Sequence, residues 1–301
     1  TAGSAFSSVL KGSNAKSCHC VAAPEDGPTP LSTYRRRREH AWARGLPNPG
    51  LASFVWKCAV FALSLTAGSA TAATTPIRFA GQNSELVVSE ISAHTLRLQL
   101  SSLDEQARPR SAAPSTVLVP FPSAEKLRAR ELDGEKQLGV GRLRVTIKPQ
   151  PLRVTVHRED GRLLQELGFD DAAATNAAVA FRTDAPVLGL GEGAQQFDRR
   201  GALYPMEPSW GGWNRPVLGS VVPSPFLIGA DGWALFAHRP EGRFDLREGK
   251  GRFIPQQWPQ GGASLDLFVI EVSQPADALT EYDRLTGRPV LPPKWTMGYF
   301  Q

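Results

Sequence analysis

The chain has 301 residues, of which 41% are hydrophobic and 21% are charged. This composition is typical of a folded protein and excludes a wholly disordered chain, while the length accommodates one large domain or two modest ones. The formal net charge is +5, and residues 1–72 alone hold eight basic and three acidic groups. The remainder therefore carries no net charge, and no nucleic-acid-binding surface is expected.

The N-terminal part has the composition of a leader. Residues 1–50 are rich in Ser, Pro, Gly and Ala without apolar periodicity, which predicts a disordered or non-native leader. Residues 51–72 then present a lysine, a short apolar run and small residues that end at Ala70-Thr71-Ala72. This layout predicts a signal peptide and a secreted or periplasmic protein; the alternative is a buried helix or strand. The apolar run is too short for stable membrane insertion.

From residue 74 onward, apolar and polar residues alternate with period two, as they do in half-buried strands. Asp160-Gly161 and Asp231-Gly232 are typical hairpin turns. The alternation and these turns predict strands at 96–100, 143–147, 152–156, 163–167, 226–237 (a hairpin) and 265–272. Many short strands separated by turns indicate a mainly β fold, an antiparallel β-sandwich.

Two regions of this part are less regular. Residues 101–137 are rich in Ser, Ala, Pro, Arg and Glu, so long loops are expected around a short strand at Val117 to Val119. Residues 170–180 are expected to form a loop.

One helix is predicted near the C-terminus. Ser273 and Pro275 open it, and Gly287 ends it. The apolar positions expected to pack on the sandwich are Leu279, Tyr282 and Leu285. Residues 288–301 are expected to be a linker followed by the start of an apolar strand at Trp295, which would open a further domain.

A glycine-rich segment, Gly189-Leu-Gly191-Glu-Gly193-Ala194, has the spacing of the dinucleotide-binding fingerprint. That fingerprint requires a helix directly afterwards, whereas Gly201 and Pro205 interrupt the next stretch of this chain. We therefore predict a glycine-rich strand end that packs against another segment, and no nucleotide cofactor.

No metal site is predicted either. The three cysteines, Cys18, Cys20 and Cys58, precede the expected cleavage point, so the mature part would hold no disulfide. No second ligand pair comes after Cys18-His19-Cys20 at a useful spacing. Beyond the leader, the histidines stand alone in the sequence and are expected to be surface or hydrogen-bonded structural residues; they are His94, His157 and His238.

The segment Trp210-Gly-Gly-Trp213-Asn214-Arg215 combines two aromatic faces with polar and cationic neighbours on a glycine-containing loop. Aromatic rings can cover the apolar side of a sugar, while the amide and guanidinium groups bond its hydroxyls. We therefore predict a substrate-binding role for Trp210, Trp213, Asn214 and Arg215. The alternative, with equal weight, is that both tryptophans belong to the core.

Four segments together resemble glycoside hydrolase family 31, the α-glucosidase and α-xylosidase family. The resemblance covers residues 76–301. The segments are Gly189-Leu-Gly-Glu192 with Phe197-Asp198-Arg199-Arg200-Gly201, Pro225-Phe-Leu227 with Gly232-Trp-Ala-Leu-Phe236, Tyr282-Asp-Arg-Leu-Thr-Gly-Arg-Pro289, and Leu291-Pro-Pro-Lys-Trp295-Thr-Met-Gly-Tyr-Phe-Gln301.

The resemblance implies a galactose-mutarotase-like β-sandwich with a closing helix over residues 74–287, and then the first strand of a truncated (β/α)8 barrel, with Gln301 at the barrel mouth. In the family, both catalytic aspartates lie on later barrel strands, which would come after Gln301. The resemblance thus implies that this chain alone has no catalytic residue and is inactive. The family's sandwich lends a loop to the sugar pocket, and Trp210 to Arg215 falls where that loop belongs.

The sequence therefore predicts the N-terminal part of an exported, retaining α-glycoside hydrolase. Its expected partners are an α-glucoside or α-xyloside and its own C-terminal catalytic barrel, with no cofactor or metal. The alternative is a non-catalytic carbohydrate-binding or structural β-sandwich protein.

Overall fold

The computed structural model describes residues 74–110, 114–171, 177–192, 196–207, 222–239, 241–257 and 262–298. The expected leader and signal peptide, residues 1–72, lie outside the described residues, as does Gln301.

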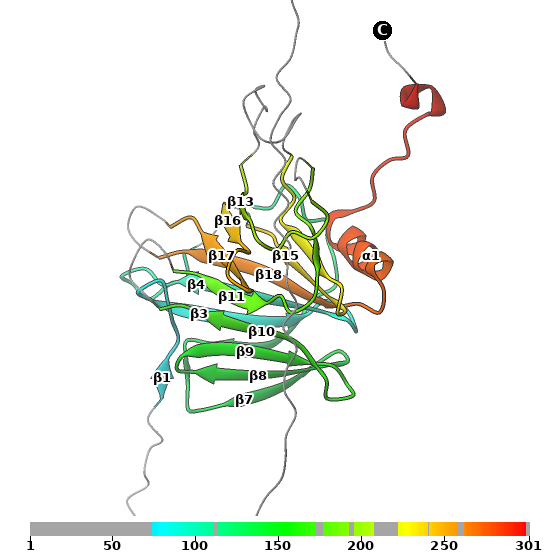
Figure 1. Ribbon diagram of the computed structural model, residues 1–301. Coiled ribbons are helices and arrows are strands. Elements are labelled where there is room, and N and C mark those ends of the chain that lie inside the picture. Colours follow the sequence, from blue (N-terminus) through cyan, green and yellow to red (C-terminus); the bar gives the residue numbers. More distant parts are fainter. Residues whose placement is uncertain are drawn as a thin grey trace, which may run out of the picture. The chain divides into compact units, whose positions relative to one another are not determined.

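Antiparallel strands form two large sheets (Figure 1). Sheet I runs in the order β13 (Leu203–Pro205), β16 (Gly242–Asp245), β17 (Lys250–Pro255), β11 (Val179–Arg182), β10 (Leu163–Phe169), β9 (Leu152–His157), β8 (Leu143–Pro149) and β7 (Lys136–Val140). Sheet II runs in the order β12 (Val187–Gly189), β14 (Phe226–Gly229), β15 (Trp233–Ala237), β18 (Ser264–Glu271), β4 (Thr95–Ser102), β3 (Gln82–Glu90) and β2 (Arg78–Phe79), and β5 (Ala124–Ala129) also pairs with β3. A small separate ladder joins β1 (Thr75–Pro76) to β6 (Glu131–Leu132).

The inner faces of the two sheets share one apolar core. On sheet I the inward residues include Val145, Val154 and Leu167, and on sheet II they include Leu98 and Leu267. All five are almost completely buried, and their polar neighbours along each strand point outward, as the period of two requires. The predicted antiparallel β-sandwich is thereby confirmed.

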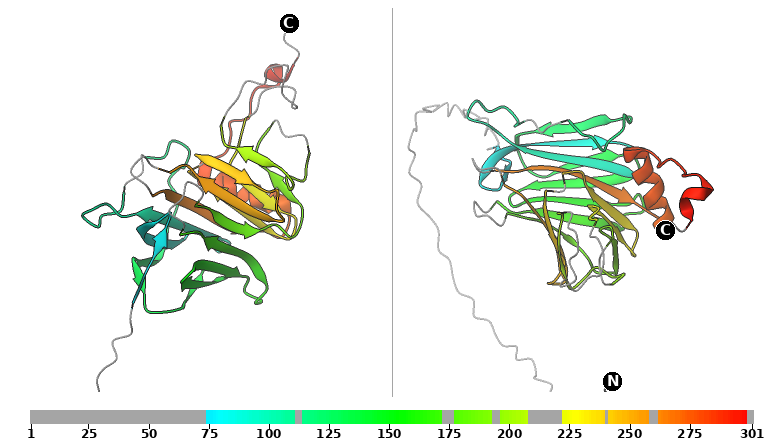
Figure 2. Two further views of the ribbon diagram at one scale, coloured as in Figure 1. Left: turned by 60° about the vertical axis from the view of Figure 1, so that its left-hand side comes forward. Right: turned by 90° about the horizontal axis from the view of Figure 1, so that it is seen from above.

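The outer face of sheet II carries a second apolar cluster under helix α1 (Pro275–Thr286), which can be followed against β15 and β18 in Figure 2. Tyr282 stacks on Phe226 with ring centroids 4.6 Å apart, and Leu285 is fully buried. Leu279, by contrast, is 54% exposed, so its predicted packing on the sandwich is wrong; Ala278 is buried in this cluster instead. Within the described ranges, no helix is long and apolar enough to cross a membrane.

Polar contacts fix both the start and the middle of α1. The Asp277 carboxylate accepts hydrogen bonds from the backbone N–H groups of Ser273 and Gln274, which caps the first turn. Glu281 is buried and accepts hydrogen bonds from the hydroxyls of Ser92 and Thr95, each at 2.7 Å. Since these hydroxyls lie around the β3–β4 turn, Glu281 ties the helix to sheet II.

Replacing Glu281 with alanine should lower the free energy of unfolding by about 1–3 kcal/mol, because two hydroxyls near the helix lose their acceptor. The matched control is Leu279→Ala on the same helix, where an exposed side chain is shortened and a change below about 0.5 kcal/mol is expected. Urea unfolding of both variants measures the difference. Equal destabilisation by the two substitutions would contradict the anchoring role of Glu281.

Two local expectations differ from the structure. In residues 101–137 the strands are β5 and β6, whereas Val117 to Val119 is not a strand; its backbone instead reaches α1, where the Val119 N–H bonds the Leu285 carbonyl at 2.9 Å. Residues Lys294–Met297 form a 3-10 helix, not the expected first barrel strand. A strand needs a neighbour for its backbone groups, and none pairs with this segment among the described residues, so local bonds such as Thr296 N–H to the Pro293 carbonyl take their place.

Candidate functional site

The predicted sugar-binding residues, Trp210, Trp213, Asn214 and Arg215, lie outside the described residues. The two sides of their connection are described. The chain enters it from β13 in sheet I and leaves it into β14 in sheet II, so the segment passes from one sheet to the other. Whether the two tryptophans bind sugar or join the core stays a prediction.

The glycine-rich segment packs against residues 222–229. Val187–Gly189 pairs with β14, the Leu190 N–H bonds the Phe226 carbonyl at 2.9 Å, and the Glu192 N–H bonds the Val222 carbonyl at 3.0 Å. The predicted packing of a glycine-rich strand end against another segment is confirmed. In residues 187–192 and 196–207 no helix is present, although a dinucleotide site would require one.

The close approach of this segment to the backbone of Phe226 and Val222 explains why glycine stands at positions 189 and 191. A Cβ atom at Gly189 would lie 2.1 Å from the Phe226 carbonyl oxygen, and one at Gly191 would lie 2.1 Å from the Val222 carbonyl oxygen. Both residues also have positive φ, +106° and +77°, which favours glycine. Leu190 between them has φ of +63°, so the segment turns through three successive left-handed residues.

Arg199 clamps this turn from the far side. Its guanidinium donates to the carbonyl oxygens of Gly189 at 2.7 Å and Gly191 at 3.2 Å. Asp198 accepts from the Val187 N–H at 3.1 Å and pairs with Arg200 at 2.7 Å. The hydrogen bond from Arg200 is the main cause that lowers the pKa of Asp198 to about 2, so this carboxylate stays charged in mildly acidic solution. These hydrogen bonds hold the backbone of residues 187–191 in place, and Gly189, Gly191 and Arg199 are called the frame below.

A buried polar network lies on the outer side of sheet II. Asp266 receives two hydrogen bonds from Arg97, at 2.7 and 2.6 Å, and lies 2.7 Å from His238 Nδ1. His238 Nε2 lies 2.7 Å from Ser115 Oγ. Burial alone would raise the pKa of Asp266, but the hydrogen bonds from Arg97 and His238 outweigh it and lower the pKa.

The contacts from Ser115 to His238 and from His238 to Asp266 resemble those of a hydrolytic triad. The other contacts of these residues nevertheless indicate a structural role. Ser115 Oγ also accepts the backbone N–H groups of Val117 at 3.1 Å and Leu118 at 2.8 Å, and Asp266 is held by Arg97. The network therefore pins residues 114–121 to sheet II. His238 is a hydrogen-bonded structural residue as predicted, but it does not stand alone; sequence reasoning missed its partners because they lie far away along the chain.

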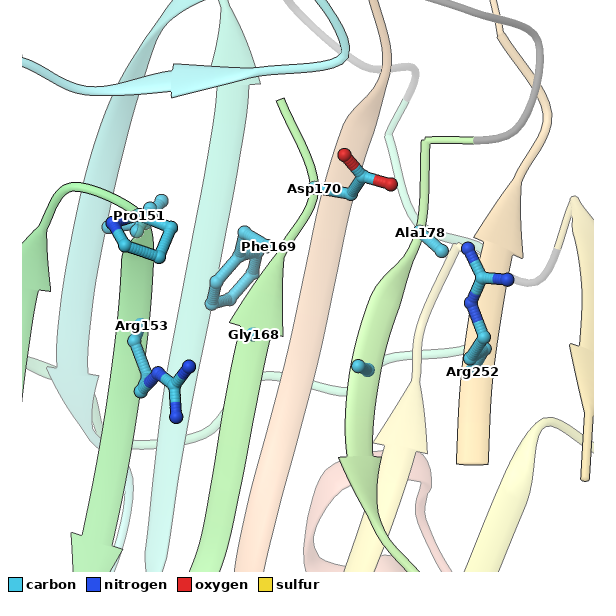
Figure 3. Close-up of a pocket in the computed structure, with 9 residues that line it drawn as sticks. Pro151, Arg153, Gly168, Phe169, Asp170, Ala178 and Arg252 are labelled. Atoms are coloured by element: carbon cyan, nitrogen blue, oxygen red, sulfur yellow. The ribbon is translucent and has the colours of Figure 1, made fainter. Parts of the chain in front are cut away.

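Cavities on the outer faces of the sheets include two that described residues line. One of about 370 Å³ lies over β3, β4 and β18 and is lined by four arginines with Glu85 and Asp266. Its Arg97 pairs with Asp266 and its Arg128 pairs with Glu85, so these guanidinium groups already have carboxylate partners. The other, of about 190 Å³, lies on sheet I around Gly168 (Figure 3). Across the described part of the chain, no three His, Cys, Asp or Glu side chains gather to hold a metal ion.

Comparisons with known proteins match part of the chain. The chain is 26% identical over 208 residues to alpha-glucosidase 2 of Bacillus thermoamyloliquefaciens. The matched region covers 64% of this chain and 25% of that protein. The chain is 27% identical over 139 residues to an alpha-xylosidase of Emericella nidulans, which covers 46% of this chain and 17% of that protein. The chain therefore spans a quarter or less of the length of these relatives. No family model matches it.

Among solved structures, the fold resembles a GH31 dextranase of Flavobacterium johnsoniae that was crystallised with isomaltotriose. The TM-score is 0.55 at 17% identity, over 72% of this chain and 27% of the dextranase. At 17% identity this similarity supports the fold only, and any chemistry has to be argued from the residues of this chain.

Proposed function

From the premise that this chain resembles the N-terminal portion of glycoside hydrolase family 31 enzymes, as the curated relatives and the solved structures establish, we propose that it is the N-terminal β-sandwich of a retaining α-glycoside hydrolase. In this proposal the sandwich is galactose-mutarotase-like, supports a catalytic barrel in a longer protein, and lends the segment containing Trp210 to Arg215 to the sugar pocket. Export through residues 51–72 is part of the same proposal.

The observation that carries the proposal is the frame formed by Gly189, Gly191 and Arg199. A hydrogen-bonded frame that precedes β13, which in turn precedes the segment with tryptophan, asparagine and arginine, is suited to help present those side chains in a fixed geometry. The frame lies within the first of the four segments on which the family resemblance rests. An α-glucoside or an α-xyloside is the substrate class that the curated relatives favour.

The chemistry itself is proposed to reside outside this chain. A retaining mechanism requires two carboxyl groups about 5–5.5 Å apart across the sugar, one as nucleophile and one as acid and base. The buried carboxylates among the described residues of the sandwich bind neighbouring side chains and thereby stabilise the fold. Glu85 is bound by Arg128 and Arg130, Asp266 by Arg97, and Glu281 by two hydroxyls.

The test compares this chain with the protein encoded by the longer reading frame, assayed with p-nitrophenyl α-glucoside and α-xyloside. We expect no turnover by the 301-residue chain and hydrolysis with retained anomeric configuration by the longer protein. In the longer protein, Trp213→Ala should raise KM about tenfold, since stacking on an aromatic ring contributes on the order of 1 kcal/mol or more. Thr146→Ala, on the outer face of sheet I, is the matched control and should leave KM unchanged.

The alternative function is a non-catalytic carbohydrate-binding or structural sandwich. It predicts sugar binding, or no binding, without hydrolysis by any length of the protein. Turnover by the purified 301-residue chain would overturn the assignment of catalysis to a separate domain. An inactive longer protein would favour the alternative.

A further inference from the structure

The outer face of sheet I carries an excess of positive charge that the net charge of the chain conceals. Along β8, β9, β10, β11, β16 and β17 the residues that alternate with the buried core positions point outward. Seven of these outward residues are basic and two, Glu166 and Asp245, are acidic. The basic ones are Arg144, Lys148, Arg153, Arg182, Arg243, Lys250 and Arg252.

The strand register places several of these residues in one line across the sheet. From β16 to β8, the residues opposite one another are Asp245, Arg252, Ala180, Gly168, Arg153 and Lys148. The two central positions have almost no side chain, so a trough of about 190 Å³ opens there. Figure 3 shows Arg153 and Arg252 on opposite sides of Gly168.

Arg252 has a carboxylate nearby but none at hydrogen-bond distance in the described part of the chain. Asp245 faces it from β16 and interacts with it electrostatically, while the hydrogen-bonded partner of Asp245 is Arg247. No ion pair or hydrogen bond involves the side chains of Arg144, Arg243 or Lys250 among the described residues on this face. Arg153 pairs with Glu166 at 2.6 Å, but both side chains are about four-tenths exposed, so solvent weakens that pair. The larger cavity on sheet II differs, because its Arg97 and Arg128 are already bound to carboxylates.

The spacing suits a carboxylate-bearing ring. Arg153 and Arg252 stand three strands apart, which is about 14 Å between backbones, and both line the trough between them. A guanidinium binds a carboxylate through two parallel hydrogen bonds, and the shallow floor of Gly168 and Ala180 leaves room for one face of a sugar ring. The lining also contains one carboxylate, Asp170, which has an interaction of its own. The other basic side chains on this face of sheet I could then bind further anionic groups of an extended, polyanionic ligand.

We propose that the trough around Gly168 and Ala180, with Arg153 and Arg252, is a binding site for an acidic polysaccharide that contains uronic acids. The ring of one uronate lies over the two small residues, and its carboxylate binds Arg252. The choice of a polysaccharide over other polyanions rests on the proposed function, whereas the site itself does not depend on hydrolysis of any glycoside.

The test measures binding of polygalacturonate oligomers to the full chain by titration calorimetry at low salt. Arg252→Gln should weaken binding about tenfold, as expected for a lost hydrogen-bonded charge. Gly168→Val keeps every charge and fills the trough, and it should weaken binding by a similar factor. A Cβ atom at Gly168 meets only the Ala180 Cβ at 3.9 Å, so the fold should tolerate this change. Thermal melts check that both variants are folded.

Arg144→Gln is the matched control, because it removes the same charge from the same face away from the trough and should change affinity less than about twofold. Equal weakening by Arg144→Gln and Arg252→Gln, with no effect of Gly168→Val, would overturn the trough as the site. Absence of binding would overturn it as well. Duplex DNA binding as tightly as polygalacturonate would show a general polyanion surface and overturn the polysaccharide, while neutral dextran should not bind. Hydrolysis assays on the longer protein test the proposed function separately.

Discussion

The variant Gly189→Ala should lose about 3–5 kcal/mol of stability, from overpacking and from a left-handed backbone that alanine adopts at a cost. The new methyl group would lie 2.1 Å from the Phe226 carbonyl oxygen, which belongs to a strand and cannot move aside alone. Relief requires β12 to separate from β14, which also breaks the Arg199 hydrogen bond to this turn. With about 2–4 °C for each kcal/mol in a domain of this size, the melting temperature should fall by about 6–20 °C.

Gly139→Ala on β7 provides the control for this prediction. Nothing lies within 4 Å of a Cβ atom at Gly139, and its backbone is not left-handed. Alanine there should be neutral or slightly stabilising, since glycine in a strand loses more backbone entropy on folding. Thermal melts of the two variants decide the matter. A Gly189→Ala protein that melts with the parent would show that the turn can rearrange and that the frame is not rigid.

Replacing Asp266 with alanine should cost about 3–5 kcal/mol, because Arg97 would be left with its positive charge and without its carboxylate partner beside a buried histidine. Asp266 is only 5% exposed, and His238 is buried beside it. The control is Asp171→Ala, which removes an exposed carboxylate paired with Arg78 at 3.0 Å and should cost less than about 1 kcal/mol. Equal effects on urea unfolding would contradict the network as a structural clamp.

The same carboxylate should make stability depend on pH. Its pKa in the folded protein lies below the ordinary aspartate value, since the hydrogen bonds from Arg97 and His238 outweigh burial. The unfolded chain therefore takes up a proton first as the pH falls, and the stabilisation present at neutral pH is lost below the ordinary value of about 3.9. The difference in melting temperature between the parent and Asp266→Ala should thus shrink from pH 7 toward pH 3. If the difference in melting temperature grows as the pH falls, the pKa of Asp266 is raised on folding and not lowered.

Sequence patterns were sufficient to predict those elements that depend on residues close together in the chain. Alternation along Leu143 to Ile147 and Leu152 to Val156 predicted β8 and β9, and Asp231-Gly232 predicted the turn between β14 and β15. Capping and spacing predicted α1 within two residues of its observed start. The same reasoning failed at Leu279 and at Trp295, because helical spacing does not say which face is covered, and a strand forms only where a partner strand is present.

The sequence alone determined the class of fold and predicted a glycine-rich strand end packed against another segment, because alternation, turn chemistry and a glycine-rich run are properties of neighbouring residues. Only the tertiary structure decided which distant groups meet. His238 finds Asp266 across adjacent strands β15 and β18, and Arg252 comes into line with Arg153 through the register of four strands. Charge clusters of this kind depend on strand order, and strand order is set by packing of the core between two sheets, which no local pattern encodes.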